Sequence, residues 1–595
     1  MTSRRYANHA FDDCKVWLCQ LFLVGLLGLL GCAAPSQPPD PKPLLSPLAD
    51  GPLADRAPDF TYRNGLSGKL YFPEIVGGGG ALMDVDNDGD LDLYLVQGQN
   101  LEAPAETWYD RLFRNDGGGS RWTDITGSAG LGNTTGYGMG VAAGDIDNDG
   151  WTDFYVTNFG SNQLWRNNGG EGSQTFTDIT AISGVDDPRW STSAAFVDVD
   201  HDGWLDLYVV NYVDFRLSNH EQCVNEAGRP DYCGPRSYRP ETDRLFRNLG
   251  LDKDGVVGFE DISESAGLLE APGPGLGVVT ADFNGDGLID LYVANDQARN
   301  HLWLNKGDLR FQESALASGS AMDSQGRVQA SMGIDAADVD GDGDTDLFMT
   351  HLLREVNTLY LNDGKGLFVD RSSATGLGSP SIGYTGFGAA FLDVENDGDP
   401  DVLVVNGEVR LIDQQLEAGI PFALRQPNQL FLNQDPQGPT FIDASSQVPV
   451  LAEPWVSRSV IVGDLDNDGD ADAIVTNNES PVQILFNRVG QDAFWIGFRL
   501  QDVHGRDALG ATITLQNGDS SQHSEQHKQV RTDGGYLSAR DPRALFGLGN
   551  TEPEAVQVQV LWPSQRCELW EGLAAGSYHV LTEGEGKPCA ITSSY

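Results

Sequence analysis

The sequence predicts an all-β protein, a seven-bladed β-propeller followed by a small β-domain. An acidic nine-residue pattern, D-x-[DNE]-x-D-G-x-x-D, occurs seven times, beginning at residues 84, 145, 198, 282, 338, 393 and 464. Short segments rich in β-branched and aromatic residues surround each copy and are bounded by Gly and Asn, which is typical of strands. A recurring unit of this size indicates a repeat architecture, and short strands repeated in this way favour the blades of a propeller.

The first residues are typical of a secretory signal. The apolar run 16–30 is too short to span a bilayer but suits the core of a signal peptide, so residues 1–31 are predicted to be removed. The residues before Cys32 resemble a bacterial lipobox, so we expect Cys32 to be lipidated; the alternative is an ordinary signal cleaved near Ala33. Residues 32–58 are a Pro-rich linker. Together these features predict an exported protein anchored by lipid to the cell envelope, at the bacterial outer membrane or the cell surface.

The composition excludes several classes of protein. The chain has 595 residues with 87 acidic and 38 basic side chains, a formal net charge of −49. A nucleic-acid binder needs a basic face, and an anionic membrane surface would repel this charge. Disorder is disfavoured, because 40% of the residues are hydrophobic and 9% are aromatic. Because a core can form despite this net charge, we expect the charge of the acidic side chains to be accommodated locally, and their positions in the sequence have to be explained.

The repeated unit continues beyond the acidic loop and sets the predicted boundaries. An apolar strand follows each loop, then an N-x-L-[WYF]-x-N segment in most units and an F-x-[DE] strand. The seventh unit lacks the last strand, and a similar fragment at 60–68 is predicted to complete the seventh blade and close the ring; the alternative is a free arm. The predicted propeller spans 59–490, the small β-domain 491–583 and a C-terminal tail 584–595.

The acidic loops, numbered one to seven in chain order, have the spacing of a calcium site. Ca²⁺ takes six to eight oxygen ligands at about 2.3–2.6 Å, and alternate residues of a tight loop can converge on one centre. We predict side-chain ligands at positions 1, 3, 5 and 9 and a carbonyl ligand at position 7, with Gly at position 6 permitting the turn. Up to seven calcium ions are expected. The predicted ligands are Asp84, Asp86, Asp88, Asp90 and Asp92; Asp145, Asp147, Asp149, Trp151 and Asp153; Asp198, Asp200, Asp202, Trp204 and Asp206; Asp282, Asn284, Asp286, Leu288 and Asp290; Asp338, Asp340, Asp342, Asp344 and Asp346; Asp393, Glu395, Asp397, Asp399 and Asp401; and Asp464, Asp466, Asp468, Asp470 and Asp472.

Other interpretations of the loops are weaker. An EF-hand needs a bidentate Glu at position 12 and flanking helices, but position 12 is apolar in every copy. A solvated acidic turn would explain one copy more easily than seven, and Mg²⁺ prefers fewer protein ligands. Loop four has Asn284 at position 3, so we expect it to bind calcium more weakly. His201, at position 4 of loop three, is expected to face solvent.

Four cysteines remain after the predicted signal and lipidation site. They are Cys223, Cys233, Cys567 and Cys589, and four cysteines allow three pairings. Proximity in the sequence favours Cys223–Cys233 and Cys567–Cys589, which suits an oxidising compartment.

The repeats and the C-terminal region resemble known families. The units are similar to the FG-GAP/VCBS repeats of integrin α-subunit propellers, which carry calcium loops on their blades. Residues 492–583 resemble the ASPIC/UnbV domain in the segments 510–514, 533–538, 546–549 and 561–563. The combination resembles the cartilage acidic protein family and its bacterial relatives, and implies a secreted or surface propeller with calcium in its blades. On the residues alone the C-terminal region is a small β-domain, with Gly534 and Gly535 as a candidate hairpin turn.

The sequence offers no convincing catalytic set. The nine His residues are scattered and no nucleophile, zinc or phosphate-binding motif occurs. We therefore expect a non-catalytic scaffold that binds a protein or glycan at the cell surface, with no nucleic-acid partner and membrane contact only through its anchor. An extracellular polysaccharide-acting enzyme and a purely structural envelope component are the alternatives. The long segments 212–238 and 407–426 are the candidate binding loops, and packing against neighbouring parts of the chain is their alternative role.

Overall fold

A computed structural model describes residues 57–103, 108–132, 136–170, 174–435, 438–517, 525–551 and 556–590. The predicted signal, Cys32 and all but the last two residues of the predicted linker lie outside these ranges. Within them the chain is built almost entirely from antiparallel sheets, with a few helices of four or five residues: α1 (Thr180–Ser183), α2 (Ser263–Ala266), α3 (Ala315–Ser318), α4 (Gly378–Ser381) and α5 (Asp413–Glu417). No helix in the described part of the chain is long and apolar enough to cross a membrane.

Each acidic loop joins the first two strands of one sheet. The sheets, in chain order, are β1 (Gly80–Met83), β2 (Asp92–Leu95), β3 (Arg111–Asn115) and β4 (Trp122–Asp124); β5 (Gly138–Gly144), β6 (Asp153–Asn158), β7 (Gln163–Asn167) and β8 (Phe176–Asp178); β9 (Ser191–Val197), β10 (Asp206–Asn211), β13 (Arg244–Leu251) and β14 (Val257–Asp261); β15 (Gly275–Ala281), β16 (Asp290–Asn295), β17 (His301–Asn305) and β18 (Phe311–Glu313); β19 (Ile334–Ala337), β20 (Asp346–Met349), β21 (Thr358–Asn362) and β22 (Phe368–Asp370); β23 (Gly386–Leu392), β24 (Asp401–Asn406), β25 (Gln429–Asn433) and β26 (Phe441–Asp443); and β27 (Ser457–Gly463), β28 (Asp472–Asn477) and β29 (Gln483–Leu485).

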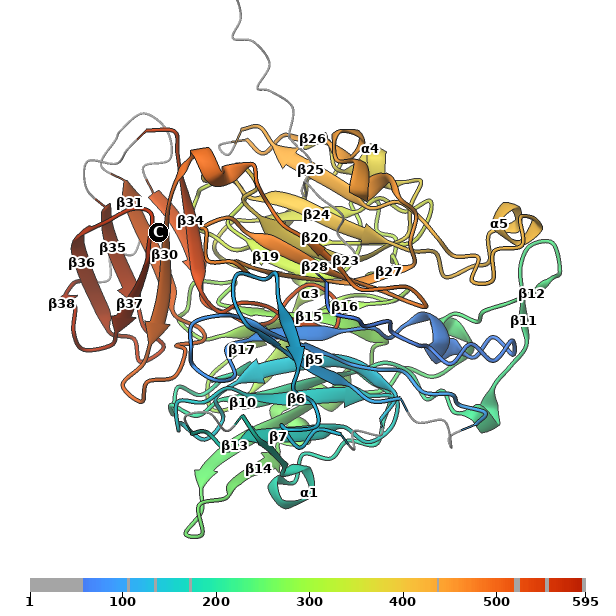
Figure 1. Cartoon of the computed structure of the whole chain (residues 1–595), viewed down its shortest axis with the longest axis horizontal. Coiled ribbons are helices and arrows are strands. Elements are labelled where there is room, and N and C mark those ends of the chain that lie inside the picture. Colours follow the sequence, from blue (N-terminus) through green and yellow to red (C-terminus); the bar gives the residue numbers. More distant parts are fainter. Residues whose placement is uncertain are drawn as a thin grey trace, which may run out of the picture. The chain divides into compact units, whose positions relative to one another are not determined.

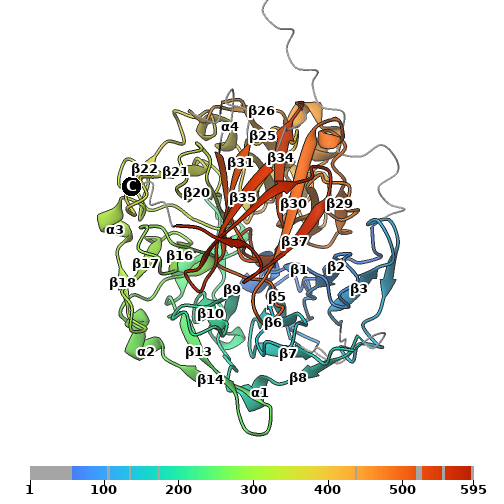
Figure 2. The ribbon, with the colours of Figure 1, turned by 90° about the vertical axis from the view of Figure 1, so that its left-hand side faces the viewer.

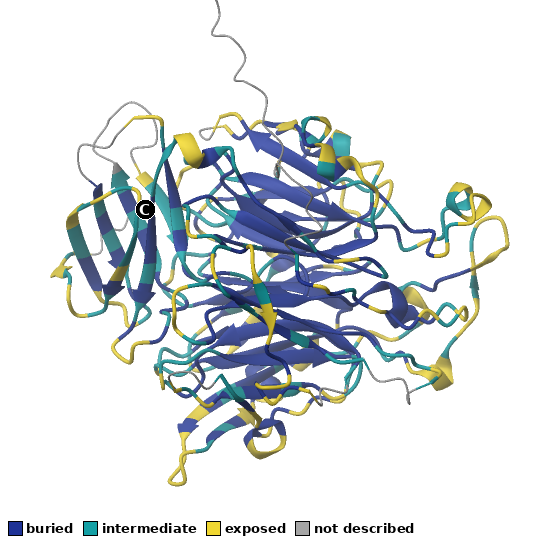
Figure 3. Ribbon diagram, viewed as in Figure 1, coloured by how far each residue is buried: buried dark blue, intermediate teal, exposed yellow. Residues whose placement is uncertain are grey.

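The first strands of successive sheets lie against one another. Strand β1 contacts both β5 and β27, and the contacts β5–β9, β9–β15, β15–β19, β19–β23 and β23–β27 connect the others in order. Figure 2 shows β5 and β9 toward the centre of this arrangement and β8, β14, β18 and β22 at its rim. The first two strands of each sheet are largely buried (Figure 3), because they pack between neighbouring sheets, which explains their nearly continuous apolar sequences.

The N-terminal fragment does not form the fourth strand predicted for the seventh sheet. That sheet has three strands among the described residues. The backbone N–H groups of Glu479 and Val482 donate to the carbonyls of Tyr62 (2.9 Å) and Phe60 (3.0 Å), so the fragment meets the turn before β29 through isolated bridges. The fragment thus joins the seventh unit, because this turn presents free backbone N–H groups, but it does not extend the sheet.

The C-terminal region forms two packed sheets. One contains β34 (Ala544–Gly549), β30 (Phe494–Gln501) and β37 (Tyr578–Thr582), and the other contains β32 (Glu525–Gln529), β31 (Thr512–Asn517), β35 (Val556–Leu561), β36 (Cys567–Leu573) and β38 (Lys587–Pro588). Cys567 and Cys589 form a disulfide here, and Cys223 and Cys233 form another across the hairpin of β11 (Cys223–Val224) and β12 (Pro230–Asp231). We call this region the C-terminal domain (Figure 1).

One segment of the C-terminal domain leaves its own sheets and runs among the first strands of the repeats. Its strand β33 (Ser538–Ala539) pairs parallel with β1, and Gly535 exchanges two backbone hydrogen bonds with Ile334. The buried carboxylate of Asp335 lies 2.6 Å from both Arg531 and Arg540 at the two ends of this segment. The candidate hairpin at Gly534 and Gly535 is therefore wrong: these glycines serve an insertion into another part of the fold.

Candidate metal centres

All seven acidic loops share one backbone conformation. Gly at position 6 has φ between 83° and 96°, and the residue at position 4 also lies in the left-handed region. The position-1 carboxylate accepts hydrogen bonds from the N–H groups of positions 5 and 6; in loop two Gly150 donates to Asp145 at 2.7 Å. The loop thus wraps around its own first aspartate, and only Gly adopts the position-6 conformation without strain.

The position-9 aspartate fastens the loop to its sheet. In loop two Asp153 is fully buried, and it accepts hydrogen bonds from the N–H of Ile146 (3.0 Å) and of Asn167 on β7 (2.7 Å). The same pair of bonds occurs in all seven units. The strand after each loop therefore begins at a fixed distance from the loop's other carboxylates.

Five loops gather carboxylate oxygens closely enough to hold one ion. In each, three carboxylates offer oxygens that lie within 4.8 Å of one another. The groups are Asp84, Asp86 and Asp88; Asp145, Asp147 and Asp153; Asp198, Asp200 and Asp206; Asp338, Asp340 and Asp346; and Asp464, Asp466 and Asp472. Loop four, with Asn284 at position 3, and loop six, with Glu395 there, do not form such a group among the described residues.

The position-3 aspartates of these five loops fit a cation. Oδ1 of Asp86, Asp147, Asp200, Asp340 and Asp466 is buried and has no hydrogen-bond donor in the described part of the chain. Asp147 is only 3% exposed. A buried anionic oxygen without a donor is costly, so a hard cation that takes oxygen ligands suits these positions.

Burial also raises the pKa of the loop carboxyls. Burial, together with the neighbouring acids in the same loop, raises the pKa of the position-1 groups of Asp145, Asp338 and Asp393 to about 7. The pKa of Asp84, which Arg499 lowers again, is raised to about 6. Without a counter-ion these groups resist full ionisation near neutral pH, whereas a divalent cation would favour the ionised form.

Two sets of residues around the loops were not predicted to matter. An Asn in or just after the third strand donates its side-chain amide to the position-2 carbonyl of the loop in the preceding sheet, as Asn167 does to Val85 (3.0 Å); six units make this bond. The sequence signal that could have identified these asparagines is the last Asn of the N-x-L-[WYF]-x-N segments. The second set lies in the C-terminal domain: Arg499 contacts Asp84 (3.1 Å) and Tyr578 donates to Asp464 (2.9 Å).

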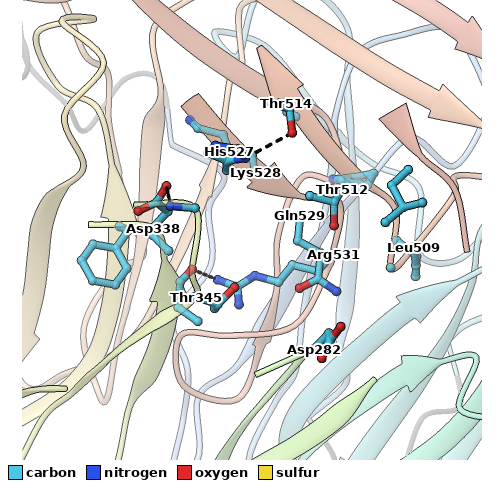
Figure 4. Close-up of a pocket in the computed structure, with 18 of the residues that line it drawn as sticks. Asp282, Asp338, Thr345, Leu509, Thr512, Thr514, His527, Lys528, Gln529 and Arg531 are labelled. Atoms are coloured by element: carbon cyan, nitrogen blue, oxygen red, sulfur yellow. Dashed lines mark hydrogen bonds between the residues drawn. The ribbon is translucent and has the colours of Figure 1, made fainter. Parts of the chain in front are cut away.

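A cavity of about 480 Å³ lies where the C-terminal domain meets loops three to seven. Figure 4 shows Asp282 and Asp338 from the loops on one side and Lys528 and Arg531 on the other, with His527 hydrogen-bonded to Thr514. His201, which we expected to face solvent, lines this cavity, and its Nδ1 lies 2.7 Å from the carbonyl of Pro563. The expectation is wrong, because the C-terminal domain covers that loop.

Comparison with known families separates the same two parts of the chain, the repeats with their acidic loops and the C-terminal domain. Residues 502–588 match the ASPIC and UnbV family, and residues 84–156, 145–209, 282–349 and 351–404 match the FG-GAP-like repeat. The chain is an FG-GAP-like repeat protein with an ASPIC and UnbV domain. The predicted combination is confirmed. The matched FG-GAP-like repeats include loops one to six, while loop seven, which begins at Asp464, lies beyond them.

The FG-GAP-like repeat protein is similar to curated relatives over most of its length. It is 26% identical to cartilage acidic protein 1 of Homo sapiens over 531 residues, which cover 85% of this chain and 71% of that protein. It is 25% identical to cartilage acidic protein 1 of Xenopus tropicalis, covering 82% and 70%. A lectin structure from Agrocybe aegerita aligns at 16% identity and a TM-score of 0.35, covering 65% of this chain and 90% of that one. A score this low supports no inference about function.

Proposed function

We propose that this protein is an exported, calcium-stabilised propeller of seven blades that acts as a non-catalytic binding or adhesion scaffold for a protein or glycan at the cell surface. The calcium ions would be held by the seven acidic loops, up to one in each. Ca²⁺ supplies charge neutralisation and coordination there, while the chain supplies oxygens fixed by the backbone N–H groups described above.

Closure of the ring is supported at the join between its ends. Strand β1 contacts β27, and the N-terminal fragment bridges to the turn before β29. Asn115 of the first sheet donates to the loop of the seventh as other units do to the loop before them. Closure buries the edges that a row of sheets would otherwise leave free.

The observation that carries the calcium proposal is the buried Oδ1 of the five position-3 aspartates. Thermal unfolding in EDTA and in millimolar Ca²⁺ tests it. We expect Ca²⁺ to restore a melting temperature that EDTA lowers, because occupancy at 100 times Kd stabilises the fold by about 2.7 kcal/mol per independent site. Mg²⁺ at the same concentration should restore less, and Asp147→Asn should reduce the calcium effect. An identical melt with EDTA and with Ca²⁺ would defeat the proposal.

The two long insertions support a binding face away from the loops. Figure 1 places β11, β12 and α5 at the end of the molecule remote from the C-terminal domain. The insertions contact each other, since Arg229 pairs with Asp413 (2.9 Å) and the N–H of Leu411 donates to Asp231 (3.1 Å). Their buried parts pack against the fold, but the hairpin keeps Val224 56% exposed. An apolar side chain displayed on a braced hairpin suits contact with a partner.

A calcium-dependent pull-down from envelope extract and a glycan array test the binding role. We expect Val224→Ser to reduce capture, while Ile182→Ser, a change on α1 at a side chain that is 64% exposed, should leave it unaltered. If both variants lose capture, or if both keep it, the proposal that the hairpin of β11 and β12 forms the binding face is contradicted. Hydrolysis of a polysaccharide on the same array would favour the enzyme alternative, and no capture at all would favour a structural role.

The lipid anchor is a separate part of the proposal. Cys32 lies outside the described residues, and the mass of the mature N-terminus decides whether that residue carries acyl chains. We expect Cys32→Ala to release the protein from the membrane fraction. Membrane retention of this variant would contradict lipid anchoring without affecting the calcium proposal.

A further inference from the structure

The side chain at position 4 of each loop connects that loop to a neighbour. Position 4 is Asn in loops one, two, six and seven, His in loop three and Gly in loops four and five. In the four Asn loops φ lies between 52° and 57°. This left-handed conformation, which Asn tolerates, directs the side chain away from the loop's own carboxylates.

Each of these four amides donates to the position-6 carbonyl of the next loop. The four donor–acceptor pairs are Asn87 to Gly150 (2.9 Å), Asn148 to Gly203 (3.1 Å), Asn396 to Gly469 (2.9 Å) and Asn467 to Gly89 (3.4 Å). Asn467 also donates to Asp90 at 2.8 Å. These bonds connect loops six, seven, one, two and three in one uninterrupted series.

The peptide group that receives the bond belongs to the neighbouring loop's predicted calcium site. In loop two the Gly150 carbonyl and the Trp151 N–H form one peptide group. Asn87 of loop one holds its oxygen, and Asp149 of loop two accepts a hydrogen bond from its N–H at 3.1 Å. The next carbonyl along the chain, that of Trp151, is the predicted position-7 ligand. Two loops therefore position the same ligand.

The series ends at loop three. His201 faces the carbonyl of Pro563 in the C-terminal domain, and Gly285 and Gly341 have no side chain to donate. In loop four the position-6 carbonyl of Gly287 accepts a hydrogen bond from Gln565 of the C-terminal domain at 3.3 Å. The direct Asn bond is thus missing between loops three and four, between loops four and five, and between loops five and six.

We propose that calcium binding is cooperative along loops six, seven, one, two and three, and that the position-4 asparagines carry the coupling. The proposal rests on the calcium function proposed above. Calcium draws the carboxylates at positions 3 and 5 of one loop together and so fixes the residue between them. That residue then holds the shared peptide of the next loop in the conformation its ligand needs, which lowers the cost of the next binding event.

Terbium, which replaces calcium in oxygen sites, measures one loop at a time. Among the seven loops only two and three carry Trp at position 7. The luminescence that is lost in Trp151→Phe therefore reports on loop two. Asn87→Gly removes the amide without strain, because loops four and five carry Gly at this position with positive φ. We expect this variant to raise the terbium midpoint of loop two by about threefold to tenfold, the factor that one ordinary hydrogen bond provides.

A double-mutant cycle decides between coupling and independent sites. Asp86→Asn, which disables loop one, should raise the loop-two midpoint as much as Asn87→Gly does, and the double variant should raise it no further. Asp340→Asn, the matched change in loop five, should leave it unaltered. A loop-two midpoint unmoved by Asp86→Asn, or fully additive effects, would overturn the coupling while calcium binding stands. Absence of calcium and terbium binding by the unaltered protein would overturn both proposals.

Discussion

The side-chain amide of Asn115, at the end of β3 in the first sheet, donates to the carbonyl of Leu465, in the loop of the seventh sheet, at 3.0 Å. These residues are 350 positions apart in the chain. The same bond between other neighbouring sheets joins consecutive repeats, so here it joins the beginning of the array to its end. Each loop is thus held by its own sheet through position 9, and every loop except the fifth is also held by the next sheet through an Asn.

Replacing Asn115 with Ala tests how much this bond contributes. The buried Leu465 carbonyl would lose its donor, so we expect a loss of about 1–2 kcal/mol in the free energy of unfolding. Asn433→Ala is the matched control, because Nδ2 of Asn433 has no hydrogen-bond partner among the described residues. Denaturant unfolding in saturating Ca²⁺ measures both. Equal losses would show that the bond to Leu465 contributes nothing.

Loop four should gain calcium affinity when its third position becomes acidic. In the structure Asn284 accepts a hydrogen bond from the N–H of Asp286 at 3.0 Å, as the loop geometry requires, but it brings no charge. We expect Asn284→Asp to bind one calcium more tightly, by about tenfold, since a charged ligand replaces a neutral one. Isothermal titration calorimetry should resolve this change. The reverse change in loop two, Asp147→Asn, should weaken one site, and a titration unaltered in either variant would contradict the ligand assignment.

The sequence predicts the loops and their following strands well because both are local. Seven copies of one pattern place Gly150 and its equivalents at a turn only Gly adopts freely, and the apolar residues after Asp153 begin a strand in each case. The connections between repeats are not local. Asn167 was visible as a repeated residue, but its partner Val85 lies in another repeat. The insertion around Gly535 depends on pairing with β1 and on hydrogen bonds with Ile334, which lie far from it in the sequence.

We expect Arg166 to weaken calcium binding at loop two and to stabilise the calcium-free form of that loop. Its guanidinium lies 2.5 Å from Asp147 and 3.4 Å from Asp149, and Arg247 and Arg488 contact the equivalent aspartates of loops three and seven. Arg166 directly precedes the last Asn of β7, and the residue at this position on β17, β21 and β25 is Leu. A unit charge and a double charge about 6 Å apart in water repel by roughly 1.4 kcal/mol, which is about tenfold in affinity.

We therefore expect Arg166→Leu to bind calcium about tenfold more tightly at loop two and to melt at a lower temperature in EDTA. The Trp151-dependent terbium signal measures the first effect and calorimetry the second. Arg310→Leu, an exposed change in the turn between β17 and β18, should alter neither. Weaker binding in Arg166→Leu would show instead that the guanidinium mainly positions Asp147 as a ligand.

The acid sensitivity of the fold should depend on His351, which is 1% exposed. Its Nε2 lies 2.9 Å from Oγ1 of Thr358, whose hydroxyl donates to Gln329, so Nε2 is assigned as the donor. Nδ1 is then unprotonated, and it is buried without a partner among the described residues. Burial lowers the pKa of His351 to about 4 from an ordinary value of 6.5.

Because the folded pKa lies below the unfolded one, the unfolded chain binds this proton more tightly. The contribution of His351 to stability is complete above pH 6.5 and is lost as the pH falls towards 4, where the loss reaches roughly 3 kcal/mol. We expect His351→Gln to lose less stability than the unaltered protein between pH 6.5 and 4 in denaturant titrations. His504→Gln, at an exposed turn of the C-terminal domain, should keep the original slope. If both variants keep it, other groups cause the acid sensitivity.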